Sequence, residues 1–228
     1  MQSKTKDGCG VGNNAEYYEK NGKRYDRITR ILDYFPHPDL VDWKIDVGRR
    51  EARRVSTVAT NIGDNVDEYV KQKLLGGKLP KLKTQEAKNC LEAFESWVAA
   101  YSPVLKVGET VFDDALMVAG TPDLIWNDTL IDIKCSREIK HSYWLQTEFY
   151  ARCLGVQYKA VLRLDKNLAM FEYKKMKLSD DDWAACRAAI TLHRFYNKTL
   201  RDVAHPKGKK GKGEVSNDSN LNITYSPV

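Results

Sequence analysis

The chain has 228 residues, enough for one domain with a hydrophobic core, or for one domain with tails. Its composition, 42% hydrophobic and 30% charged, is ordinary for a soluble protein, and no stretch approaches the roughly 18 to 20 apolar residues that a membrane-spanning helix needs. The formal net charge of +6 permits a nucleic-acid partner without requiring one, because part of the excess lies in the lysine-rich stretch 207–212.

The five cysteines are odd in number and widely spaced, and they include no C-x-x-C pair. We therefore expect free thiols in a reducing compartment, and neither a zinc nor an iron–sulfur site built on cysteines. Residues 1–14 are polar and contain no apolar core, so no secretory signal is expected and the expected location is the cytoplasm.

The first segment, residues 1–22, is polar and contains glycine, and we expect it to be loose. Beyond it, apolar residues recur at helical or strand spacing. Helices are expected over residues 52–74, 84–100, 139–154 and 179–203. Strand character is expected over residues 104–118, 124–126, 130–133, 156–164 and 169–177.

This order of helices and strands predicts the α/β class, with a central mixed β-sheet flanked by helices in one domain over residues 23–205. Residues 206–228 are rich in Gly, Lys, Ser and Asn, and are expected to form a disordered basic tail.

Two carboxylates and a lysine lie on a predicted hairpin between residues 120 and 134. Asn127–Asp128 separates two short β-favouring apolar runs, which is a turn signal. Asp123 then stands at the start of one strand. Asp132 and Lys134 point to the same face of the other strand, because side chains alternate along it. Such a pocket suits a hard divalent cation with a water molecule held by the lysine.

D-x-K by itself is weak evidence, because a surface ion pair on a strand is its usual explanation. Other residues strengthen the pattern. Gln146 and Tyr150 lie at i and i+4 on the next predicted helix, hence on one face. Upstream, Gly63 and Asp67 lie on the amphipathic helix predicted over residues 52–74.

Together these elements resemble the PD-(D/E)xK nuclease superfamily. Within it they resemble the RecB-type exonuclease branch, which includes many phage exonucleases and the mitochondrial genome maintenance exonuclease. The resemblance covers roughly residues 25–165 and implies a restriction-endonuclease-like core. The matching elements are G-x-x-D, D-x-K and Q-x-x-x-Y, at Gly120/Asp123, Asp132/Lys134 and Gln146/Tyr150.

One position departs from the pattern of that branch, which usually carries a histidine in a G-x-x-V-H context. This chain has Asp67 there, after Gly63 and Val66. Aspartate can still serve, because Mg²⁺ prefers oxygen ligands. Asp67 is therefore a candidate metal ligand. A solvated helix residue is the alternative, and Glu68 is the ligand if the register is off by one.

The resemblance implies phosphodiester hydrolysis, in which a metal ion neutralises negative charge and lowers the pKa of its bound water. Asp123 and Asp132 would then be metal ligands, helped by the carbonyl of Ile133. Lys134 would position or help deprotonate the attacking water, and would stabilise the developing charge.

The predicted helix after the hairpin supplies supporting candidates. Gln146 would bond near the scissile phosphate or orient Lys134. Tyr150 would pack behind the site or touch the DNA backbone, with plain core packing as the alternative. Softer candidates for phosphate contacts are Arg137, Lys140 and His141, which a solvated basic loop explains about as well. Tyr143 and Trp144 are softer candidates for base stacking, although packing against the sheet is the more common role of such residues.

The expected function is a Mg²⁺-dependent deoxyribonuclease, with Mn²⁺ able to substitute. The resemblance alone favours an exonuclease on DNA ends or single-stranded DNA. A structure-specific or restriction-like endonuclease is one alternative, and a DNA-binding protein with an inactive nuclease fold is another. The resemblance to phage enzymes implies recombination, replication or repair in a bacterial host cytoplasm, with a protein partner from those processes left open.

Overall fold

The structure, a computed structural model, describes residues 17–33 and 38–204, and the side chains of residues 17–33 and 40–197. It divides into two units, residues 1–193 and 194–228, and the features below lie in the first unit, apart from the end of the last helix. Residues 1–16 and the expected basic tail 206–228 lie outside the described residues. Within the described ranges the four cysteines are free, as expected, and no helix combines the length and apolarity that a membrane crossing requires.

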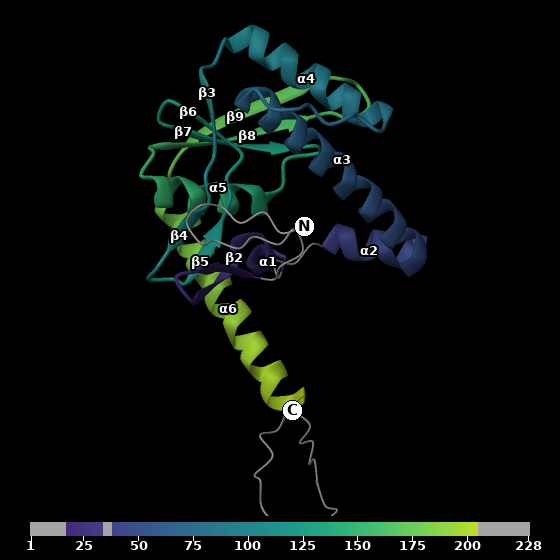
Figure 1. Cartoon of the computed structure of the whole chain (residues 1–228). Coiled ribbons are helices and arrows are strands. Elements are labelled where there is room, and N and C mark those ends of the chain that lie inside the picture. The colour runs from purple at the N-terminus through teal and green to yellow at the C-terminus, as the bar shows by residue number, and fades with distance from the viewer. Residues whose placement is uncertain (1–16, 34–37, 205–228) are drawn as a thin grey trace, which may run out of the picture. The chain divides into compact units, whose positions relative to one another are not determined.

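A five-stranded mixed sheet is the main sheet of the first unit (Figure 1). Its strands in spatial order are β3 (Leu105–Val107), β6 (Leu124–Trp126), β7 (Thr129–Lys134), β8 (Tyr158–Leu164) and β9 (Phe171–Lys177). β7 and β8 are parallel, and the other neighbours are antiparallel. Asn127 begins the turn between β6 and β7 with a φ of 53°, a left-handed conformation that asparagine tolerates. The α/β class and the predicted hairpin are therefore confirmed.

A second sheet, of four strands, is not expected from the sequence. Its spatial order is β1 (Tyr17–Lys20), β2 (Lys23–Arg27), β5 (Val118–Gly120) and β4 (Val111–Asp113). The expectation of a loose segment up to residue 22 is wrong for residues 17–22, because Asn21–Gly22 forms a hairpin turn with positive φ values. The strand expected over residues 104–118 is divided, since β3 joins the five-stranded sheet and β4 and β5 join this one.

The four predicted helices are present with small shifts at their ends, and two further helices precede them. The six helices of the described residues are α1 (Ile28–Leu32), α2 (Pro38–Val47), α3 (Arg49–Leu75), α4 (Gln85–Tyr101), α5 (His141–Leu154) and α6 (Asp180–Ala204). Local signals explain their ends. The Thr84 side chain accepts a hydrogen bond from the Ala87 N–H at the start of α4, and left-handed Gly76 and Gly155 end α3 and α5.

Helices cover both faces of the five-stranded sheet, and β7 shows how the faces divide. Ile131 and Ile133 are buried in the cluster that includes residues of α3 and α4. Leu130 is buried in the cluster that includes α5. Because side chains alternate along a strand, Asp132 and Lys134 share the face of Leu130 and point toward α5.

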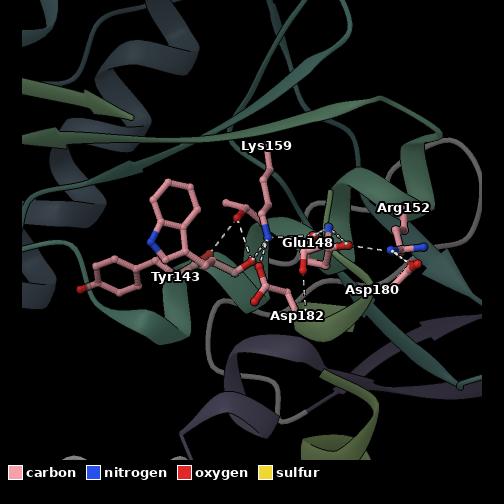
Figure 2. Close-up of polar contacts among 9 residues, drawn as sticks. Tyr143, Glu148, Arg152, Lys159, Asp180 and Asp182 are labelled. Atoms are coloured by element: carbon pink, nitrogen blue, oxygen red, sulfur yellow. Dashed lines mark hydrogen bonds and ion pairs between the residues drawn. The ribbon is translucent and has the colours of Figure 1, made fainter. Parts of the chain in front are cut away.

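A buried charge network fixes α5 against β8 and the start of α6 (Figure 2). Glu148 of α5 and Lys159 of β8 are both fully buried, and their Oε2 and Nζ atoms are 2.7 Å apart. Lys159 also contacts Asp182, while Arg152 joins Glu148 to Asp180. At about 100° per residue, Glu148 lies on the opposite side of α5 from the residues two positions before and after it. The network therefore sets the rotation of the helix face that carries Gln146 and Tyr150.

Candidate active site

A cleft of about 1920 Å³ opens at the carboxyl end of β7. Its lining includes most of the residues predicted for the site: Asp67, Asp123, Ile133, Lys134, Gln146 and Tyr150. The remaining residue, Asp132, is 1% exposed and contacts Lys134 and Gln146 from below the surface. The hairpin, α3 and α5 thus bring all the predicted site residues into one neighbourhood.

Asp123 precedes β6 and is held in place by backbone contacts. Its carbonyl accepts a hydrogen bond of 2.9 Å from the Gly108 N–H. A Cβ atom at Gly108 would collide with the backbone of Pro122, so this close approach requires glycine. The Asp123 Oδ2 atom accepts a 2.8 Å bond from the Ile133 N–H, which leaves Oδ1 on the cleft side. Gly108 has no functional side chain, so the sequence did not mark it as a residue of the site.

Asp132, Lys134 and Gln146 contact one another in a closed triangle. The Lys134 Nζ atom is 2.7 Å from Asp132 Oδ2, and Gln146 Nε2 donates a 2.9 Å bond to Asp132 Oδ1. Lys134 also donates a 3.3 Å bond to Gln146 Oε1. Asp132 Oδ2 lies beside the ammonium as an ion pair but accepts no well-aligned hydrogen bond from the described residues. It retains lone-pair capacity for a further cation.

Burial and neighbouring charges shift the protonation of this triangle. Burial raises the pKa of Asp132 to about 7, an effect that Lys134 opposes and Asp123 reinforces. Burial lowers the pKa of Lys134, but the charges of Asp132 and Asp123 outweigh it, and the net shift is upward. Lys134 is therefore an ammonium at neutral pH, able to donate hydrogen bonds and unable to accept a proton.

Tyr150 packs behind the triangle and is 2% exposed. Burial raises its pKa well above the usual value, and the charge of Asp132 contributes to the shift. The ring lies against Gly120, where an added Cβ atom would be 2.5 Å from Tyr150 Cε1 and 2.7 Å from its hydroxyl oxygen. The glycine of the G-x-x-D element thus makes room for the tyrosine of the Q-x-x-x-Y element.

The substitution Gly120→Ala is expected to destabilise the chain by about 1 to 3 kcal/mol, because the new methyl group overpacks a buried ring. Urea denaturation measures the loss. Gly63→Ala is the matched control, since a Cβ atom at Gly63 meets nothing within 4 Å and alanine favours the interior of α3. Equal stability of Gly120→Ala and the unmodified chain would contradict this packing.

Asp67 reaches the site from α3, together with a lysine that sequence reasoning missed. The Lys71 Nζ atom is 2.8 Å from Asp67 Oδ2 and 3.9 Å from Asp123 Oδ1. Asp67 Oδ1 is buried and has no hydrogen-bond partner among the described residues. Burial, then the charge of Asp123, raises the pKa of Asp67 to about 6. Glu68, the alternative for a shifted register, accepts a bond from Gln72 on an exposed part of the helix.

The kind of donor atoms in the cleft fits a hard divalent cation, which prefers carboxylate oxygens. These atoms do not form a three-ligand site as they stand. Among the described residues, no three His, Cys, Asp or Glu side chains lie close enough together to hold a metal ion. The ammonium groups of Lys71 and Lys134 lie beside the carboxylates instead.

Basic and aromatic residues flank the acidic centre of the cleft. Tyr143 lines it, and the Lys134 ammonium lies 5.1 Å from the centroid of its ring. Trp144 is placed differently, because the Lys159 ammonium lies 6.0 Å from its ring within the buried network. Of the softer candidates, those that line the cleft besides Tyr143 are Arg137, Lys140 and His141. The cleft lining also includes Arg27, Arg30 and Lys166.

A comparison with protein-family models finds no match, and no curated protein matches the sequence. Several solved structures that are similar to this chain are exonucleases. An alkaline exonuclease (LHK-Exo) from Laribacter hongkongensis is similar with a TM-score of 0.49 and 14% identity, over 80% of this chain and 92% of that chain. The same enzyme in complex with dAMP gives a TM-score of 0.47 and 13% identity, over 79% and 91%. A phage-related exonuclease from Haemophilus somnus 129PT is similar with a TM-score of 0.40 and 13% identity, over 61% of this chain and 82% of that chain. These values are low, so the function of this chain has to be inferred from its own side chains.

Proposed function

We propose that this chain is a metal-dependent DNA nuclease that hydrolyses phosphodiester bonds. One observation carries the proposal: the contacts at the end of β7, where the Ile133 N–H holds Asp123 while Lys134 and Gln146 both contact Asp132. Two carboxylates, an ammonium and an amide at one wall of an open cleft are the groups that the PD-(D/E)xK resemblance implies for phosphodiester hydrolysis.

The proposed ion is Mg²⁺, with Mn²⁺ as a substitute, held by Asp123, Asp132 and the carbonyl of Ile133. When bound, such an ion neutralises phosphate charge and lowers the pKa of its water. The position of Asp123 supports this assignment, because the bond from the Ile133 N–H holds its carboxylate against the strand that carries Asp132. Asp67 contributes a third negative charge to the same cleft.

The side chains around the ligands have separate tasks in this proposal. Lys134 holds the attacking water through its ammonium and stabilises the charge that develops on the phosphate. Because its pKa is raised, Lys134 acts as a hydrogen-bond donor and not as the base. Gln146 orients Asp132 and Lys134 through its amide, and Tyr150 supports Gln146 from the buried side.

DNA is the proposed substrate, and an exonuclease acting on ends or single strands is the proposed mode. The cleft lining includes basic side chains, with Arg27 and Arg30 from one segment and Arg137 and Lys140 from another, and such residues suit phosphate contacts. Tyr143 offers a ring on which an unpaired base can stack. The resemblance of the motifs to the RecB-type exonuclease branch favours the same mode.

The proposed setting is recombination, replication or repair of a phage-type genome in a bacterial cytoplasm, alongside a protein partner from those processes. The resemblance to phage exonucleases and the phage-related exonuclease among the structural neighbours support this setting.

The deciding experiment is digestion of linear and covalently closed circular single-stranded DNA with Mg²⁺, with a parallel reaction in EDTA. An exonuclease degrades the linear DNA, leaves the circles intact and is inactive in EDTA. Linearised circles would identify an endonuclease instead. DNA binding without cleavage in Mg²⁺ or Mn²⁺ would identify a binding protein with an inactive nuclease fold.

Metal affinity is expected to depend on pH. The pKa of Asp132 is raised to about 7 in the metal-free chain, so below that pH the ion must displace a proton from the carboxyl group. The dissociation constant for Mn²⁺ should therefore fall about tenfold for each pH unit from pH 5.5 to 7, and level off above. Calorimetric titration at several pH values measures it. An affinity that stays constant between pH 5.5 and 7 would contradict this assignment.

A further inference from the structure

Lys71 lies inside the acidic part of the cleft, yet nothing in the nuclease resemblance assigns it a role. Its ammonium lies between Asp67 Oδ2, at 2.8 Å, and Asp123 Oδ1, at 3.9 Å. Lys71 and Asp67 lie one turn apart on α3, so the helix itself presents the pair to the cleft. The side chain is 20% exposed, which makes this a largely buried ammonium.

The two carboxylates keep Lys71 charged. Its ammonium lies beside both of them, at the distances given above. A cation in this position neutralises Asp67 and Asp123. It also occupies the space between Asp67 and Asp123 that a metal ion bridging them would need.

Nucleases with two metal ions use the pair to stabilise both the attacking and the leaving oxygen of the phosphate. A lysine ammonium can supply one of those charges permanently, as a compact point charge. Asp123 is suited to such a division. Its Oδ2 atom is turned toward Ile133, on the same strand as Asp132, and its Oδ1 atom faces Lys71.

We propose that Lys71 takes the place of a second divalent cation, so that the site binds a single ion on the side of Asp123 and Asp132. Asp67 then acts by holding Lys71, and it is a positioning residue and not a metal ligand. This inference rests on the proposed nuclease function and assigns a metal stoichiometry to it.

The test is the number of Mn²⁺ ions bound per chain, measured by equilibrium dialysis and by the electron paramagnetic resonance signal of free Mn²⁺. The unmodified chain is expected to bind one ion. Lys71→Met is expected to bind two, because Asp67 and Asp123 are no longer neutralised and form a second carboxylate pair. Asp67→Asn combined with Lys71→Met is expected to return the number to one.

Lys73→Met is the matched control. Lys73 lies on the same helix and pairs with Glu95, but its side chain is 45% exposed and outside the cleft lining. This variant should bind one ion, as should Lys71→Arg, which keeps the charge. Thermal melting with and without Mn²⁺ checks that each variant is folded. If Lys71→Met does not fold, Lys71→Gln, which can still bond to Asp67, carries the same expectation of two ions.

The outcomes separate the two proposals. An unmodified chain that binds no Mn²⁺ and cleaves no DNA contradicts the nuclease function, and the role of Lys71 with it. An unmodified chain that cleaves DNA and binds two ions contradicts only the role of Lys71. The same holds if the chain cleaves DNA with one ion and the number remains one after folded Lys71→Met or Lys71→Gln is prepared.

Discussion

Replacing Lys134 with methionine is expected to slow Mg²⁺-dependent DNA cleavage by at least about 10²- to 10³-fold, the usual effect of removing a donor that stabilises transition-state charge. Methionine keeps the length of the side chain but removes the ammonium that contacts Asp132 and Gln146. Single-turnover cleavage at saturating enzyme measures the chemical step apart from DNA binding.

The control for this substitution is Lys174→Met on β9, because Lys174 is 56% exposed and pairs only with Glu172 among the described residues. It should cleave DNA at the rate of the unmodified chain. Asp132→Asn should lose both cleavage and Mn²⁺ binding, since the amide cannot replace the charged ligand. Cleavage at the unmodified rate in folded Lys134→Met would rule out the role proposed for this lysine.

Replacing Lys159 with methionine is expected to lower the free energy of unfolding by about 3 to 5 kcal/mol, the usual effect of breaking a buried ion pair by removing one partner. Glu148 and Lys159 are both fully buried, and Lys159 also contacts Asp182. Without the ammonium, Glu148 keeps only Arg152 and the backbone N–H of Ser179 as partners among the described residues. Urea denaturation measures the loss.

The exposed pair of Lys73 and Glu95 provides the control for this prediction as well. Both side chains are more than two-fifths exposed, at 45% and 42%, so Lys73→Met should change stability by less than about 1 kcal/mol. If Lys159→Met lost no more stability than Lys73→Met, the network of Figure 2 would not be what holds α5.

The reactive part of the site could be predicted from the sequence because its signals are local. The Asn127–Asp128 turn fixes the hairpin, strand alternation turns Asp132 and Lys134 to one side, and helical spacing aligns Gln146 with Tyr150. Each inference needs only a few neighbouring residues. The structure brings these side chains together as those local rules require, and their catalytic roles stay predictions.

The remaining features depend on partners far apart in the chain. β2 pairs with β5 across most of the first half of the sequence, so the four-stranded sheet has no local signature beyond its Asn21–Gly22 turn. Lys71 is a site residue because α3 packs beside Asp123, a contact between distant segments that the sequence does not reveal. The helical spacing of Asp67 and Lys71 was a signal that could have indicated the pair.

Two further kinds of residue were not predicted: a glycine required by close backbone packing, and a lysine that is fully buried. Gly108 matters because the backbone of Pro122 approaches it, and a glycine alone gives no sign of its neighbours. Lys159 lies on β8, whose sequence is mostly apolar with two basic residues. Its full burial depends on Glu148 and Asp182 from two other elements. Burial of a lysine can be inferred only once its partners are known.

The contacts of the β6–β7 hairpin join residues that are close in the sequence, whereas those of the four-stranded sheet join residues that are far apart. Asp123 and the Ile133 N–H that binds it are 10 residues apart, and Gln146 and Asp132 are 14 apart. Tyr18 and Thr121, which also line the cleft and form a hydrogen bond with each other, are 103 residues apart in the sequence. Closing short loops costs less conformational entropy than closing long ones. The proposed ligands Asp123, Asp132 and Ile133 therefore belong to a short contiguous module. Removing the β1–β2 hairpin would take Tyr18 and Arg27 out of the cleft lining while leaving every proposed ligand of the ion in the chain.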